Sequence, residues 1–169
     1  MNTIIILQLI IAFLVGFAGL FLLNQIITGF LKRNYQIDET DNTSLAIFQV
    51  GVILSGTLIL SSVVDPAVNA IRLLNPTGAI EISKLGSSFA YIGLFAIIGI
   101  ISTILVVVGG LLAVFQMTKV NEIEEIKAKR INSSLVAAAF IIGISYIVSS
   151  YCGHLCEAMI PYPDVLHIR

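Results

Sequence analysis

The sequence predicts an all-α, polytopic membrane protein whose four transmembrane helices form two parallel two-helix repeats. Four long apolar stretches dominate the chain, at Ile4–Leu31, Ser44–Val64, Phe89–Met117 and Ser134–Cys152. Each reaches or approaches the roughly 20 residues that a helix needs to cross a hydrocarbon layer about 30 Å thick. Hydrophobic residues make up 57% of the chain and charged residues 11%, a composition typical of membrane proteins rather than soluble domains.

The first stretch has the features of a retained span and not of a cleaved secretory signal. No basic residue precedes Ile4, the apolar run is too long for a signal peptide, and no small-x-small site closes it. We therefore expect residues 1–169 to form a single integral membrane domain.

Basic residues between the stretches predict the orientation. Lys32 and Arg33 follow the first stretch, and four more lysines and arginines lie within 119–130, after the third. Because cytoplasmic loops carry the excess of Lys and Arg, loops 32–43 and 119–133 should be cytoplasmic, with both termini outside the bacterial inner membrane. The mixed charges of 119–130 also predict a solvated helical extension of the third span. The formal net charge of −1 provides no basic field that would bind nucleic acid.

The second pair of stretches repeats the first after a shift of ninety positions. The tetrad at 42–45, Asn-Thr-Ser-Leu, then falls on Asn-Ser-Ser-Leu at 132–135, and Ser55 falls on Ser145. This match predicts repeat one at 1–75 and repeat two at 89–153. Because each repeat holds two spans, an even number, the halves should share one topology about an axis near the membrane normal.

Each tetrad begins a predicted span. Asn42 or Thr43, and Asn132 or Ser133, can therefore cap the free amides of a helix start. The functional alternative is that the two polar starts converge on the repeat axis and bind an ion or a lipid headgroup.

The paired Asn-Thr/Ser-Ser motif, at 42–44 and 132–134, resembles that of the YjfL-like bacterial inner-membrane family (domain of unknown function 350), and the resemblance covers nearly the whole chain. Further positions similar to that family in the first repeat are Gly51, Ser61, Ser62, Asn69 and Ala70. The resemblance implies a four-helix inner-membrane protein without an assigned reaction. It also implies an association with membrane-stress systems of the phage-shock type.

Asp65 and Pro66 follow the second stretch. Asp favours a helix start and Pro suits the first helical position, so Ala67–Leu74 could form a short surface helix. Alternatively, the second span continues through Pro66 with a kink. In either arrangement Asp65 could instead be a cation site at a pore mouth.

Amide side chains within the spans are candidates for helix contacts or for a polar path. Asn24, Gln25, Gln49 and Gln116 should bond to neighbouring helices, each bond contributing about 0.6 and at most about 2 kcal/mol. No charged residue interrupts the centre of a stretch, which argues against a proton relay or an ion-coupled transporter. Taken with the two helix starts and the pore-mouth position described above, the residues that could form a polar or ion site are Asp65, Asn42, Asn132 and Gln49.

The end of the last stretch carries cysteines at 152 and 156, with His154 and Glu157 close by. Three alternatives remain open for Cys152 and Cys156. They are unmodified thiols, a disulfide formed on an oxidising side of the membrane, or part of a metal or redox site.

These patterns favour a protein that is not an enzyme and needs no cofactor. The chain has no Walker loop, no GxSxG elbow and no HExxH motif. The first hypothesis is a structural or interaction protein in the lipid bilayer, with a homo-oligomer or a membrane-stress protein as its partner. The alternative is an oligomeric small ion or solute channel or transporter. The Cys-His-Cys-Glu cluster supports a third, a membrane metal or redox protein.

Overall fold

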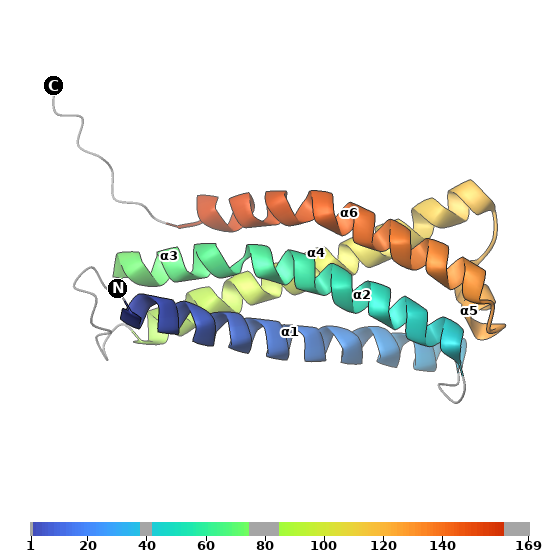
Figure 1. Cartoon of the computed structure of the whole chain (residues 1–169), viewed down its shortest axis with the longest axis horizontal. Coiled ribbons are helices and arrows are strands. Elements are labelled where there is room, and N and C mark those ends of the chain that lie inside the picture. Colours follow the sequence, from blue (N-terminus) through green and yellow to red (C-terminus); the bar gives the residue numbers. More distant parts are fainter. Residues whose placement is uncertain (1, 38–41, 75–84, 161–169) are drawn as a thin grey trace, which may run out of the picture.

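The computed structural model describes residues 2–37, 42–74 and 85–160, and its regular elements are helices (Figure 1). Their bounds are α1 Asn2–Tyr35, α2 Thr43–Ser62, α3 Val64–Leu74, α4 Leu85–Thr118, α5 Glu122–Lys127 and α6 Ile131–Ala158. The C-terminal segment 161–169, which was expected outside the membrane, lies beyond the described residues, as do 75–84 and residues 38–41 of the expected cytoplasmic loop 32–43.

Four helical segments are long and apolar enough to cross a membrane, at Leu9–Tyr35, Thr43–Leu74, Gly86–Thr118 and Ile131–Ala158. This confirms the predicted multi-pass, all-α membrane protein. The helices α1 and α4 contain 34 residues each. At 1.5 Å per residue each is about 50 Å long, so both must tilt in the bilayer or project from it.

The second span continues past Pro66, as the second alternative predicted. Figure 1 shows α3 extending the line of α2, with a one-residue break at Val63 (φ −90°, ψ −8°). The separate surface helix starting at Ala67 is therefore wrong, because α3 begins at Val64 and buries Ala67 and Val68 among others against the bundle. Asp65 lies inside the first turn of α3.

Pro66 has no N–H, so the carbonyl of Ser62 lacks its usual donor four residues later. Gly153 of α6 lies against that carbonyl, because a Cβ added to Gly153 would be 3.0 Å from the Ser62 oxygen. The glycine therefore allows α6 to approach the point where α2 and α3 join.

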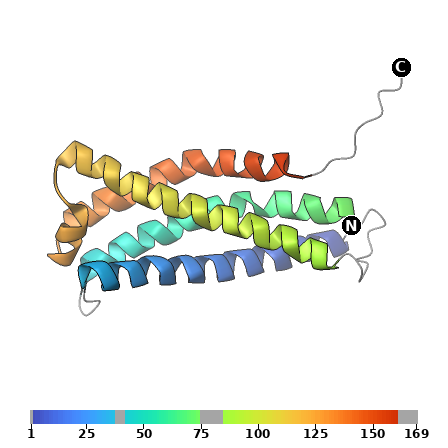
Figure 2. The same cartoon turned by 180° about the vertical axis from the view of Figure 1, so that it is seen from behind.

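The helix α2 lies at the centre of the bundle, between α1, α4 and α6. In the most apolar part of its span 44% of the residues are buried, against 22% for the first span. Figures 1 and 2 show α2 and α6 running side by side in the same direction. In contrast, α1 exposes an apolar face on which the rings of Phe13, Phe17 and Phe21 stack, with centroids 5.9 and 6.5 Å apart. A face of this kind suits contact with lipid.

The expected extension of the third span through 119–130 is wrong. The helix α4 ends at Thr118, and Lys119 adopts a left-handed conformation (φ 57°) that turns the chain. The short α5 then folds back against the bundle and buries Glu122 and Ile126. A second left-handed residue, Lys129 (φ 61°), leads from α5 into α6.

Candidate functional site

Two pairs of serines join α2 to α6 inside the bundle. The hydroxyl oxygens of Ser44 and Ser134 are hydrogen-bonded to each other, and so are those of Ser55 and Ser145. All four side chains are fully buried. Each pair joins residues that stand 90 positions apart in the sequence. We call this contact, from Ser44 and Ser134 to Ser55 and Ser145, the serine seam.

The direction of each bond follows from the single hydrogen of a hydroxyl group. Ser44 donates to the backbone carbonyl of Arg130 at 2.9 Å, so Ser134 must donate to Ser44. Ser145 donates to the carbonyl of Ile141 at 2.8 Å, so Ser55 must donate to Ser145. Both chains of hydrogen bonds end on a carbonyl, which leaves no hydroxyl hydrogen free in the seam.

Between the two serine pairs, small residues bring α2 and α6 into direct contact. A Cβ added to Gly51 would lie 2.6 Å from the Cβ and 2.8 Å from the Cα of Ala138. Two helices approach this closely only where such small residues meet. The space between α2 and α6 at Gly51 is therefore filled by protein atoms and cannot hold a file of water.

Asn42 caps α2 and ties it to α5. Its Oδ1 accepts a hydrogen bond from the Leu45 N–H at 3.0 Å, and its Nδ2 donates to the Ile126 carbonyl at 3.1 Å. The side chain is buried, with 6% of the residue exposed. The predicted capping role is confirmed for Asn42.

The same prediction is wrong for the second tetrad. The helix α6 begins at Ile131, and its N-cap residue, Arg130, makes no side-chain capping bond. Asn132 is exposed, and the Ser133 hydroxyl donates to Glu125 at 3.4 Å. The chain comes directly from α5 through Lys129, so α6 starts two residues earlier than the alignment with α2 requires. The two tetrads meet through Ser44 and Ser134, whereas Asn42 is buried against α5 and Asn132 is exposed.

Gln49 bonds to a neighbouring helix, as predicted. Its Nε2 donates to the Thr28 hydroxyl of α1 at 3.2 Å. Asn24 is half-buried, whereas Gln25 and Gln116 are exposed on the surface of the single chain.

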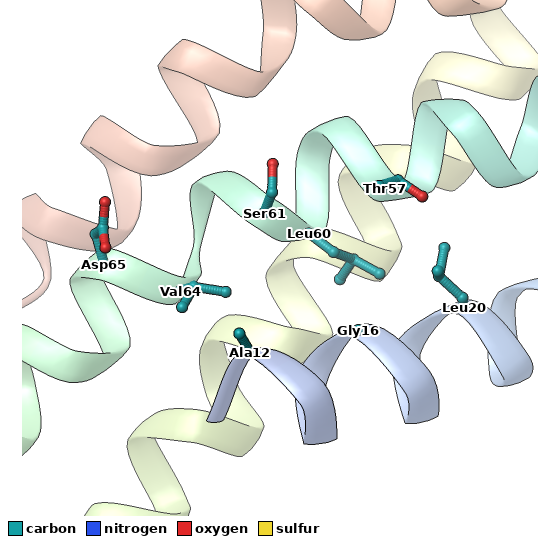
Figure 3. Close-up of a pocket in the computed structure, with 8 residues that line it drawn as sticks. All are labelled: Ala12, Gly16, Leu20, Thr57, Leu60, Ser61, Val64 and Asp65. Carbon is teal, nitrogen blue, oxygen red and sulfur yellow. The ribbon is translucent and has the colours of Figure 1, made fainter. Parts of the chain in front are cut away.

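Asp65 lies at the rim of a lateral groove of about 350 Å³ between α1 and the α2–α3 span. Figure 3 shows Ala12 and Gly16 of α1 facing Leu60 and Val64, with Ser61 and Asp65 directed away from α1. Asp65 is exposed, and Ser61 donates to the Leu58 carbonyl at 2.8 Å. The groove is therefore largely apolar, and its carboxylate stands at the edge.

Cys152 and Cys156 are buried free thiols. The thiol of Cys152 lies 3.7 Å from the Ser102 hydroxyl of α4 and donates to it. His154 and Glu157 are exposed, so the helix directs them away from the two cysteines. No group of three or more potential metal ligands forms within the described ranges 2–37, 42–74 and 85–160. Of the three alternatives that the sequence left open, this geometry corresponds to two unmodified thiols.

A second groove was not predicted from the sequence. Apolar side chains from α1, α2, α4 and α5 line a furrow of about 180 Å³, which we call the α1–α4 furrow. It adjoins a head pocket of about 220 Å³, and Leu111 and Ile123 line both spaces. The head pocket also contains Tyr35 and Glu122, and Glu122 is only 3% exposed. A glutamate within a run of mixed charges is expected to be exposed to solvent. Nothing in the sequence therefore indicated that Glu122 is buried.

Comparison with known proteins identifies a family for this chain. A family model described as Domain of Unknown Function (DUF350) matches residues 1–151. Neither the curated proteins nor the solved structures contain a match.

Proposed function

The chain belongs to the DUF350 family, and on this premise we propose that it is a non-enzymatic structural or interaction protein of the bacterial inner membrane. The observation that carries the proposal is the closed serine seam, in which the hydroxyl groups are used for contacts within the protein. In the part of the chain that the structure describes, every buried side-chain nitrogen and oxygen has a hydrogen-bond partner. Interiors satisfied in this way suit a packed scaffold better than a path for ions.

The proposal includes the duplication of 1–75 in 89–153. Residues that are related by a twofold axis and also touch each other must lie on that axis. In both pairs, Ser44–Ser134 and Ser55–Ser145, the two residues touch, and the pairs lie about three helical turns apart on parallel helices. The line through them runs along the helices. This supports a pseudo-twofold axis close to the membrane normal.

The distribution of basic residues supports the proposed orientation. Lys32 and Arg33 in the last turn of α1 lie at the end of the bundle that also holds α5 and the start of α6 (Figure 1). Arg72 lies in the last turn of α3, at the opposite end. The end with more basic residues is the cytoplasmic one. An envelope-stress protein that binds from the cytoplasm would meet α5 there.

The alternative is a small channel or transporter formed between copies of the chain. The observation that favours it is the exposure of Thr57, Ser61 and Asp65, four residues apart along an otherwise apolar span. Between copies, this row could face a shared polar path. Because the serine seam is closed, such a path would not run between α2 and α6 of one chain.

Ion flux through vesicles containing the purified protein tests the two functions. The structural role predicts no flux above that of empty vesicles. Gln49→Leu should then weaken the bundle by up to about 2 kcal/mol, through loss of the bond to Thr28, without changing flux. A conductance whose ion selectivity changes with Asp65→Asn would overturn the structural role and establish the channel.

A further inference from the structure

We propose that the α1–α4 furrow and its head pocket bind a membrane lipid with a primary ammonium headgroup, of the phosphatidylethanolamine class. The inference goes beyond the structural role proposed above and stands without it. It rests on the shape of the two joined spaces, on their opening toward lipid, and on the buried carboxylate of Glu122.

The two joined spaces match the two parts of an amphiphilic molecule, because one is apolar and the other is partly polar. The furrow of about 180 Å³ is lined by apolar residues alone, among them Ile27, Phe48 and Val107. It leads past Leu111 and Ile123 into the head pocket of about 220 Å³, where the side chains of Tyr35 and Glu122 are polar. An acyl chain fits the first environment, and a polar group attached to it fits the second.

The furrow opens sideways toward the region that lipid occupies. Phe30 and Val108 line it and are 52% and 50% exposed. Leu112 and Phe115, on the wall of the head pocket, are 58% and 47% exposed. In a membrane these exposed apolar groups face hydrocarbon, so a lipid can enter laterally without crossing water.

Glu122 is the group that selects the headgroup. Its Oε1 lies 2.8 Å from the Thr118 hydroxyl, which also lies 2.9 Å from the Val114 carbonyl. A hydroxyl has one hydrogen, so the carboxylate shares its donor with a backbone carbonyl. The nearby Arg130 pairs with Glu125 at 3.0 Å and not with Glu122. A carboxylate that is 3% exposed is a favourable partner for a cation, because an ion pair offsets the cost of burying its charge.

A primary ammonium supplies the positive charge and three N–H donors. A choline headgroup has the same charge but no N–H, so it cannot replace those hydrogen bonds. The lipid phosphate would lie near the last turn of α1, which contains Lys32 and Arg33 next to Tyr35. Glu122 in the head pocket therefore complements the ammonium of a zwitterionic lipid, and the basic last turn of α1 complements its phosphate.

Lipid binding to the full-length protein in detergent, measured by native mass spectrometry with added phosphatidylethanolamine or phosphatidylcholine, tests the proposal. We expect about a tenfold preference for phosphatidylethanolamine, comparable to one charge-assisted hydrogen bond. Glu122→Gln should abolish that preference, and the matched control Glu124→Gln, on an exposed residue of the same helix, should retain it. Equal binding of the two lipids by the unaltered protein would overturn the proposal.

A second pair of variants keeps the test valid if Glu122→Gln fails to fold. Val108→Trp should fill the furrow and reduce phosphatidylethanolamine binding at least tenfold. Leu105→Trp, on an exposed face of α4 outside the furrow, should not. Equal binding by these two variants would place the lipid elsewhere. Displacement of the lipid by free ethanolamine would identify a soluble amine as the ligand and also overturn the assignment.

Discussion

Ser55 of α2 donates a hydrogen bond to Ser145 of α6, although the two residues stand 90 positions apart. The same spacing joins Ser44 and Ser134 at the other end of the seam. Residues that stand 90 positions apart in the sequence therefore contact each other directly at two levels of the contact between α2 and α6. The proposed duplication accounts for this spacing.

Gly51 sets how closely α2 and α6 approach. Gly51→Ala should destabilise the bundle by about 1–3 kcal/mol, because the new Cβ would overlap Ala138. Gly143→Ala is the matched control on α6, since nothing lies within 4 Å of a Cβ added there. The control should be neutral or stabilising by up to about 1 kcal/mol. Thermal unfolding in detergent measures both, and equal behaviour of the two variants would contradict the close seam.

Asn42 and Asn132 should differ in their effect on stability, although they occupy equivalent sequence positions. Asn42→Ala removes a helix cap and the bond to the Ile126 carbonyl, a loss of about 1–3 kcal/mol. Asn132→Ala removes an exposed side chain and should change stability by less than about 0.5 kcal/mol. Hydrogen exchange should also become faster in α5 for the first variant only. If Asn132→Ala were the more damaging change, the observed start of α6 would be incorrect.

Cys152 and Cys156 should be recovered as two free thiols. Their side chains are buried, and Cys152 is hydrogen-bonded to Ser102 within an unbroken helix. Alkylation after denaturation without a reductant, followed by mass spectrometry, should label both cysteines. A protein that is labelled only after reduction would instead contain the disulfide that the sequence leaves open.

Cysteine labelling from outside the cell tests the orientation. With the native cysteines replaced, Met159→Cys, which follows α6, should react with an impermeant maleimide on intact cells. Lys127→Cys in α5 should react only after the membrane is opened, because we place α5 in the cytoplasm. The reverse pattern would invert the proposed topology.

The sequence predicted those features that depend on local pattern. Apolar length was enough to identify the four spans, and the polar residues before the second span indicated a cap, which the structure assigns to Asn42. The alignment of Ser55 with Ser145 after a shift of 90 positions was also visible in the sequence. Their contact was not, because two similar helices can occupy separate places in a bundle as easily as adjacent ones.

The features that sequence reasoning missed depend on how the chain turns near α5. The left-handed residues Lys119 and Lys129 fold this short helix against the bundle, which buries Glu122 and moves the start of α6. Neither residue belongs to a type that predicts a positive φ. Asn132 and Glu122 were therefore misjudged for one reason, since both lie next to a turn that only the packed bundle stabilises.

Cross-linking across the serine seam tests the central claim, that equivalent positions of the two halves meet in one chain. With Cys152 and Cys156 replaced, Ser55→Cys and Ser145→Cys should form a disulfide in native membranes under mild oxidation. Proteolysis between the two halves should then leave them joined until a reductant is added. Ser55→Cys with Tyr146→Cys is the control, because Tyr146 is 73% exposed on another face of α6, and it should not cross-link. Failure of the first pair, or equal cross-linking of both, would contradict the paired arrangement of α2 and α6.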